Sequence, residues 1–143
     1  DTEEEEAFYP TKDQSELGKR NDATNGQFLN MVRAFKTVRN LVCEEHDGEY
    51  HIPSHAIECM LFWVKGKTYK KIRDNDAEQD ARKLFLAVEQ SVRARLKNIE
   101  DLDEATEING IKPLFSNWNE YNIVLEFWND LHDYLTSNYD FER

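Results

Sequence analysis

The segment 53–64 constrains the fold of this chain more than any other part of the sequence. It begins with a proline, and its last eight residues read Ile-Glu-Cys-Met-Leu-Phe-Trp-Val before Lys65 and Gly66 end the apolar pattern. Proline suits the first turn of a helix, because its missing N–H would have no partner there. A helix that is apolar on nearly all sides must be enclosed by other elements. We therefore expect a central, buried helix that is far shorter than the roughly 20 residues of a bilayer-spanning one.

Three further segments have the period of amphipathic helices, with apolar residues at steps of three and four positions. They cover residues 24–45, 76–98 and 118–137. Thr24 or Asn25 can cap the first of them, and Asp76 can cap the second. Strand-like alternation is nearly absent, so we expect an all-α fold, a compact bundle of four principal helices.

The apolar stripes also predict which side chains meet and which face water. We expect Glu89, Arg93 and Lys97 to form a solvated face of the helix at 76–98, opposite its apolar stripe. We expect a single core that contains Phe35, Leu61, Phe62, Phe85, Val88 and Trp128.

The N-terminal part of the chain has a different character. Residues 1–23 are polar, begin with Asp-Thr-Glu-Glu-Glu-Glu and show no apolar period. We expect an extended acidic lead-in at 1–23 and a helical domain at 24–143. The start is unlike the basic start of a signal peptide, and Cys43 and Cys59 are too few for a disulfide framework. These features favour a cytoplasmic protein with no membrane segment.

Charge narrows the range of partners. The chain has 29 acidic and 18 Lys or Arg residues, a formal net charge of -11. Phosphates are repelled by such a surface, which disfavours nucleic acid and anionic membranes as partners. Any phosphate site must therefore be a local basic patch.

Two patterns invite a metal interpretation. Asp74 and Asp76, and likewise Asp101 and Asp103, form Asp-x-Asp pairs that could share a divalent cation, but their places at helix boundaries favour capping. Soft ligands also gather at Cys43, His46, His51, His55 and Cys59, without the paired spacing that normally holds zinc. A catalytic Ser–His arrangement is no better supported, because Ser54 and His55 are sequence neighbours whose side chains diverge on a helix. We assign no metal or catalytic residue to the chain.

Positive charge is the more informative pattern. Arg33, Lys36 and Arg39 follow one another at three-residue steps on the polar side of the first amphipathic helix, after Lys19 and Arg20. The row is either a solvated face paired with nearby acids or a phosphate-binding edge. A second run, Lys65, Lys67, Lys70, Lys71 and Arg73, leaves the same two interpretations open.

Three segments in order resemble the C-terminal helical half of the nucleotidyltransferases that make cyclic oligonucleotides, the group of cyclic GMP-AMP synthase, oligoadenylate synthase and the bacterial anti-phage synthases. The first reads KRNDATNGQFLNMVRAFK at 19–36. The second reads IPSHAIECML at 52–61, similar to the family's P-S-y-x-I-E-C-L-L helix. The third reads EINGIKPLF at 107–115 and continues with Trp118, Phe127 and Trp128.

The resemblance implies a nucleotide-binding role for four residues. In this family, a basic residue of the first helix and a serine at the start of the second contact nucleotide phosphates, and the next residue stacks on a base. The matching positions are Arg33 or Lys36, then Ser54, then His55. His55 replaces the usual aromatic residue but keeps a π face. Leu29 stands where the family has a basic residue, so the chain departs from the family's pattern at one expected phosphate contact.

The resemblance further implies an enzyme whose catalytic part lies elsewhere. The family's catalytic lobe precedes the helical half and carries a Gly-Ser turn and three carboxylates on a β-sheet that hold two Mg²⁺ ions. This sequence has no Gly-Ser pair and no strand-borne Asp-x-Asp. We expect NTP as the ligand and a missing catalytic lobe, in cis or in trans, as the partner. Alone, the chain should be inactive.

Two other functions stay open on the residues alone. Arg39 and His46 fit the R-x(4–6)-H pattern of metal-independent helical ribonucleases, in which His transfers a proton and Arg stabilises phosphate charge. The chain could also be a helical interaction module without a nucleotide site. That module would explain the acidity but not the three ordered segments.

Overall fold

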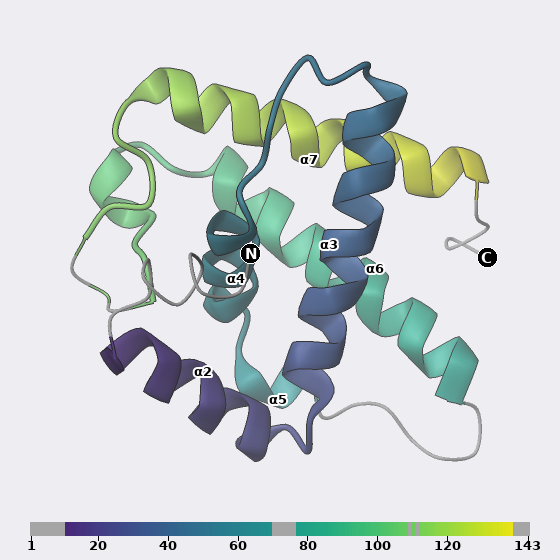
Figure 1. Ribbon diagram of the computed structural model, residues 1–143, viewed down its shortest axis with the longest axis vertical. Helices are drawn as coiled ribbons and strands as arrows, with labels where there is room; N and C mark the ends of the chain where they lie inside the picture. The colour runs from purple at the N-terminus through teal and green to yellow at the C-terminus, as the bar shows by residue number, and fades with distance from the viewer. Residues whose placement is uncertain (1–10, 70–76, 109, 111, 139–143) are drawn as a thin grey trace.

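The computed structural model describes residues 11–69, 77–108, 110 and 112–138, and within these ranges it is helical without a β-strand (Figure 1). The elements are α2 (Thr11–Ala23), α3 (Gln27–Glu45), α4 (Ser54–Trp63), α5 (Gly66–Tyr69), α6 (Ala77–Lys97), the 3-10 helix η2 (Leu102–Glu104) and α7 (Trp118–Asn138). The predicted all-α bundle is therefore confirmed, and its four principal helices are α3, α4, α6 and α7.

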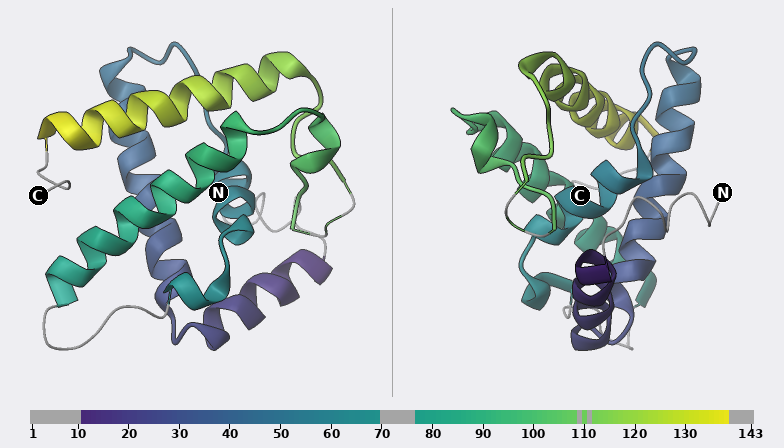
Figure 2. Two further views of the ribbon diagram at one scale, coloured as in Figure 1. Left: turned by 180° about the vertical axis from the view of Figure 1, so that it is seen from behind. Right: turned by 60° about the vertical axis from the view of Figure 1, so that its left-hand side comes forward.

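α4 lies in the middle of the bundle, as its composition predicts. Residues 56–61 of this helix are all buried. α3 and α6 contact α4, and α7 contacts both α3 and α6. Figure 2 shows α6 and α7 side by side and running in opposite directions, joined at one end of the pair by the segment 98–117. None of the described helices is both long and apolar enough to cross a bilayer.

Aromatic rings hold the three long helices together. Phe35 of α3 stacks on Phe85 of α6, with ring centroids 4.0 Å apart and planes 7° apart. Trp128 of α7 packs against Phe35 at 5.5 Å, and its Nε1 donates to Sδ of Met60 in α4 at 3.2 Å. The predicted core is confirmed, with Phe62 packed against it as a partly buried member.

The start of α3 is built differently from the sequence expectation. Gly26, not Thr24 or Asn25, is the N-cap residue, with a left-handed φ of 82° that glycine adopts without strain. Thr24 nevertheless accepts a free amide proton, because its Oγ1 receives the N–H of Phe28 at 3.0 Å. Asn21 does the same for Leu29 at 3.1 Å. Two side chains before the helix therefore satisfy amides of its first turn.

The expectation of an extended lead-in at 1–23 is wrong for Thr11–Ala23, which form α2. Residues 1–10 lie outside the described part of the chain. Leu17 is the only large apolar side chain of α2 that packs against the core, so an apolar period is missing from the sequence. A polar residue, Arg20, attaches the helix to α4 as well.

Arg20 fastens α2 to the corner between α4 and α5. Its Nη1 donates to the carbonyl oxygens of Phe62, at 3.2 Å, and Val64, at 2.8 Å. Its guanidinium also lies over the ring of Phe62, 4.2 Å from the centroid. Carbonyl groups at the end of a helix have no partner within the helix, and a cation complements the dipole there. Arg20 therefore caps α4 rather than extending the basic row of α3.

The predicted solvated face of α6 is wrong at Glu89. Its side chain is 0% exposed, because α7 covers it, whereas Lys97 is exposed as expected. Arg93 donates from Nε to Oε1 of Glu89 at 2.8 Å, and Nδ1 of His132 in α7 lies 3.4 Å from Oε2. Arg93 thus compensates the buried carboxylate between α6 and α7, while Oε2 of Glu89 receives no hydrogen bond from the described residues.

The role of Arg20 predicts a loss of stability on its removal. Arg20→Met keeps an apolar stem but leaves two carbonyl oxygens without their donor, so the free energy of unfolding should fall by about 1–3 kcal/mol. Lys19→Met is the matched control, since the Lys19 side chain is 71% exposed, and it should change stability by less than about 0.5 kcal/mol. Urea unfolding followed by circular dichroism measures both. Equal midpoints would show that α2 is attached without Arg20.

Candidate nucleotide site at the start of α4

The basic row of α3 faces the first two turns of α4. The two helices lie side by side and run in opposite directions (Figure 1), so later residues of α3 meet earlier residues of α4. Arg39 donates from Nη1 to Oγ of Ser54 at 3.0 Å and to the carbonyl oxygen of Ile52 at 3.1 Å. Its Nε donates to Oδ1 of Asn40. Arg39 therefore fixes the turn that leads into α4 together with the serine that opens the helix.

Lys36 meets α4 one turn further on. Its Nζ donates to Oε1 of Glu58 at 3.0 Å, and the two side chains are 24% and 10% exposed. Glu58 follows Ser54 by four residues, so the two lie on the same face of α4. The row of α3 thus contacts one face of α4 through two successive pairs, Arg39 with Ser54 and Lys36 with Glu58.

Arg33, the third residue of the row, is exposed. Its Nη1 donates to Oδ1 of Asn30 one turn earlier on α3, at 3.3 Å. Of the three cations of α3, Arg33 is exposed to solvent, whereas Lys36 and Arg39 already donate hydrogen bonds to side chains of α4.

His55 points away from this face, as the divergence of neighbouring helical residues predicts. Its Nε2 lies 2.8 Å from Oε2 of Glu107 and 3.5 Å from Sγ of Cys59. Glu107 belongs to the segment between α6 and α7, where its N–H donates to the carbonyl oxygen of Lys112 at 2.8 Å. Trp63, at the end of α4, donates from Nε1 to the carbonyl oxygen of Thr106. The imidazole is therefore held by a segment that is itself fastened to α4.

The start of α4 has an electrostatic character of its own. Pro53 is its N-cap residue, and no side chain accepts a hydrogen bond there as a cap. The N–H groups of a first helical turn and the helix dipole favour an anion. With Arg39 bonded to Ser54, these groups give the described surface a place where a phosphate would meet several donors.

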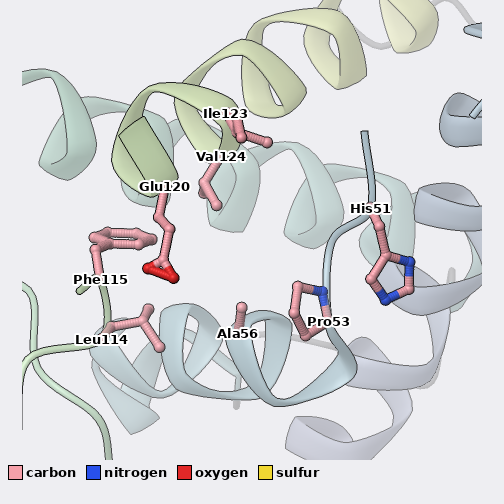
Figure 3. Close-up of a pocket in the computed structure, with 8 residues that line it drawn as sticks. All are labelled: His51, Pro53, Ala56, Leu114, Phe115, Glu120, Ile123 and Val124. Atoms are coloured by element: carbon pink, nitrogen blue, oxygen red, sulfur yellow. The ribbon is translucent and has the colours of Figure 1, made fainter. Parts of the chain in front are cut away.

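A small cavity lies on another side of the same turn (Figure 3). Its volume is about 170 Å³. Ala56 of α4 and Pro53, the residue before the helix, line it on one side. The other lining residues are His51, Leu114, Phe115, Glu120, Ile123 and Val124. The carboxylate of Glu120 accepts the N–H of Ser116 at 2.9 Å. Ligand pockets typically begin at about 300 Å³, so we assign no ligand to this gap.

The soft-ligand cluster does not converge. His46 lies 3.6 Å from Oδ2 of Asp130 in α7, and His51 is exposed. Burial raises the pKa of the Cys43 thiol, against the opposing influence of Arg39. Among the described residues, no three His, Cys, Asp or Glu side chains are placed to hold a metal ion.

The remaining sequence patterns have structural explanations where they are described. Asp101 caps η2, accepting the N–H of Asp103 at 3.0 Å within a capping box. Asp74 and Asp76 lie outside the described residues, as do Lys70, Lys71 and Arg73. Lys65 and Lys67 are exposed.

Comparison with known proteins identifies the kind of domain. Residues 15–136 match the family described as cGAS/DncV-like nucleotidyltransferase C-terminal helical domain. The chain belongs to this family. The resemblance seen in the sequence is thereby confirmed, and the match includes α3, α4, α6 and most of α7.

A curated relative extends the comparison. The cyclic dipyrimidine nucleotide synthase CdnE of Legionella pneumophila is 29% identical over 139 residues, which cover 91% of this chain and 41% of the relative. The chain thus spans less than half the length of that enzyme. No solved structure gave a significant match.

Two residues of this nucleotidyltransferase helical domain were missed by the sequence reasoning. Glu58 and Glu107 each pair with a residue that the resemblance singles out, Lys36 and His55 respectively. Glu58 had a detectable signal, because it is the one charged residue between Ser54 and Val64. Glu107 had none, since only the folded chain brings the segment 98–117 beside α4.

Proposed function

We propose that this domain forms the helical half of the active site in a nucleotidyltransferase that makes cyclic or linear oligonucleotide second messengers from NTPs. In this proposal Arg33, Lys36 and Ser54 hold the triphosphate, and His55 supports the base. The observation that carries the proposal is the packing of the basic row of α3 against the first turns of α4, in a domain of a nucleotidyltransferase family.

The phosphate part of the proposal is supported by charge and by orientation. Arg39 keeps Ser54 in place, and Lys36 is held one turn further along the same face of α4. Charge-assisted hydrogen bonds to phosphate are stronger than neutral ones, and a helix start adds donors to them. A local row of cations also offsets the net charge of -11, which would otherwise repel a triphosphate.

The base part of the proposal is supported by the restraint on His55. A side chain that stacks on a base must present its face in a fixed orientation. The contact of Nε2 with Glu107 at 2.8 Å limits rotation of the ring, which is 23% exposed. Imidazole faces stack on nucleobases in many nucleotide sites.

Catalysis in this proposal belongs to a second lobe, in cis or in trans. The described residues bring no three metal-binding side chains together, so they do not fit the two-Mg²⁺ centre that the family implies. We therefore derive no step of the reaction from this domain beyond binding and orientation of the nucleotide. The fraction of the curated relative that the chain spans, 41%, is consistent with a separate catalytic part.

We extend the proposal to the product, the location and the biological role of the complete enzyme. The curated relative is named for cyclic dipyrimidine nucleotides, and we place the product of the complete enzyme in the class of cyclic oligonucleotides. Its substrates are cytoplasmic nucleotides, so we propose that it acts in the cytoplasm. By analogy with the bacterial anti-phage synthases, we propose a role in antiviral defence.

No observation favours the two alternative functions in the same way. Arg39 contacts the start of α4, whereas His46 lies beside Asp130 of α7, so the ribonuclease pair contacts different elements. A module that binds only protein would not explain why the chain belongs to a nucleotidyltransferase family.

A double variant tests the phosphate role. In the domain together with its catalytic lobe, Arg33→Ala with Lys36→Ala should weaken binding of a non-hydrolysable triphosphate by on the order of a few kcal/mol, because charge-assisted hydrogen bonds are lost. Isothermal calorimetry measures the affinity. Lys97→Ala, an exposed lysine in the last turn of α6, is the control and should bind as the wild type does.

Thermal unfolding separates this effect from a loss of structure. Arg33 is exposed, so Arg33→Ala alone should melt as the wild type does. Lys36→Ala leaves Glu58 without its ion pair and should melt at a lower temperature. Unchanged affinity in both single variants and in the double variant contradicts the phosphate role.

A second prediction concerns the chain alone. The purified 143-residue chain should show no nucleotidyl transfer with NTPs and Mg²⁺, because two-metal catalysis needs carboxylates that the described residues do not bring together. Chromatography of the products from radiolabelled NTPs is sensitive enough to decide. Turnover above that of a buffer blank would place catalytic carboxylates within this chain.

A further inference from the structure

Glu58 has an unusual place for an acidic residue. It lies in the middle of α4, between the fully buried Ile57 and Cys59, and it is 8% exposed as a residue. A buried carboxylate is strongly disfavoured unless a cation compensates it. The backbone of a central helix cannot move it towards water. Its position is therefore set by the fold and not by the ion pair.

Lys36 has the opposite character. A lysine side chain has four rotatable bonds, and holding it in one conformation opposes binding by the entropy that is lost. Here the Nζ of Lys36 lies 3.0 Å from Oε1 of Glu58, and the lysine side chain is 24% exposed. The fixed carboxylate thus orders the mobile ammonium before any ligand arrives.

The place where the ammonium is held matters for the proposed site. Glu58 follows Ser54 by four residues, which is a rise of about 6 Å along a helix. Arg39, three residues after Lys36, contacts Ser54. Lys36 is therefore oriented on the face of α4 that also carries Ser54. An ammonium has three N–H donors and can hold a carboxylate and a phosphate oxygen at the same time.

From these observations we infer that Glu58 is a positioning residue, which orients Lys36 for the triphosphate. The inference rests on the proposed function, since it requires that Lys36 binds phosphate. It assigns to a carboxylate a favourable effect on the binding of an anion.

That assignment can be separated from simple electrostatics by the sign of the effect. Removal of a negative charge beside an anion site should tighten binding if charge alone matters. If Glu58 orients Lys36, its removal should weaken binding although the site becomes more positive. The two explanations therefore predict opposite changes in affinity.

The test is a double-mutant cycle on the domain together with its catalytic lobe, with a non-hydrolysable nucleoside triphosphate as the probe and calorimetry as the readout. Glu58→Ala should weaken binding by about tenfold, the loss expected when a charge-assisted hydrogen bond is no longer preorganised. Glu58→Gln keeps an oxygen that accepts from Lys36 and should stay within about threefold of the wild type. In the Lys36→Ala background, Glu58→Ala should cause no further weakening.

Each other outcome has a definite meaning. If Lys36→Ala weakens binding but Glu58→Ala leaves it equal or tighter, Lys36 binds phosphate without help and the inference is wrong while the proposed function stands. If Glu58→Ala weakens binding equally in both backgrounds, it does not act through Lys36, and the inference is again wrong. If Lys36→Ala has no effect, Lys36 does not bind the triphosphate and the inference is wrong, while the phosphate role of the proposed function is decided by Arg33→Ala and the double variant.

Two controls accompany the cycle. Glu126→Ala removes an exposed acid of α7 and should bind as the wild type does. Thermal unfolding of every variant identifies a general loss of structure, which Glu58→Gln is expected to escape because it keeps the volume of the side chain.

Discussion

The enclosure of α4 is the constraint on which the rest of the structure depends. This helix is apolar on nearly every side, and residues 56–61 are buried, so α3 and α6 must pack against it. Burial of apolar surface is non-directional, so it leaves open how far one helix is shifted along its neighbour. Polar contacts between the helices fix that shift. Arg39 with Ser54 and Lys36 with Glu58 align α3 with α4. Arg20 at the end of α4 fixes α2. The contacts that align α3 with α4 are thus also the contacts on which the proposed site rests.

Much of the fold was predictable, because apolar periodicity reports directly on burial. The stripe that contains Phe35 predicted α3, and the dense apolar run to Val64 predicted a central helix. Boundaries differ by three residues at the start of α3 and by at most one residue at the other ends of the four predicted helices. The capping interpretation of Asp101 was also correct, because a helix boundary explains an acidic residue without a ligand.

The parts that could not be predicted depend on contacts between distant residues. α2 lacks an apolar stripe and is fastened by Arg20, whose partners lie more than 40 residues away, at separations of 42 and 44 positions. The sequence places Glu89 on a solvated face of α6, and only the packing of α7 against that face shows that it is buried. The pair of His55 with Glu107 requires the segment between α6 and α7 to fold back onto α4. For the candidate site, the sequence identified residues by resemblance, and the structure adds the carboxylates that hold two of them.

The central claim is that the contact between α3 and α4 forms the phosphate side of a nucleotide site. The most direct measurement is a titration of the ¹⁵N-labelled chain with a non-hydrolysable nucleoside triphosphate, followed by amide chemical shifts. The account predicts weak binding in which the largest changes fall on residues 33–39 of α3 and 54–58 of α4. Largest changes around the exposed Lys65 and Lys67, or no localised change at millimolar ligand, would contradict it.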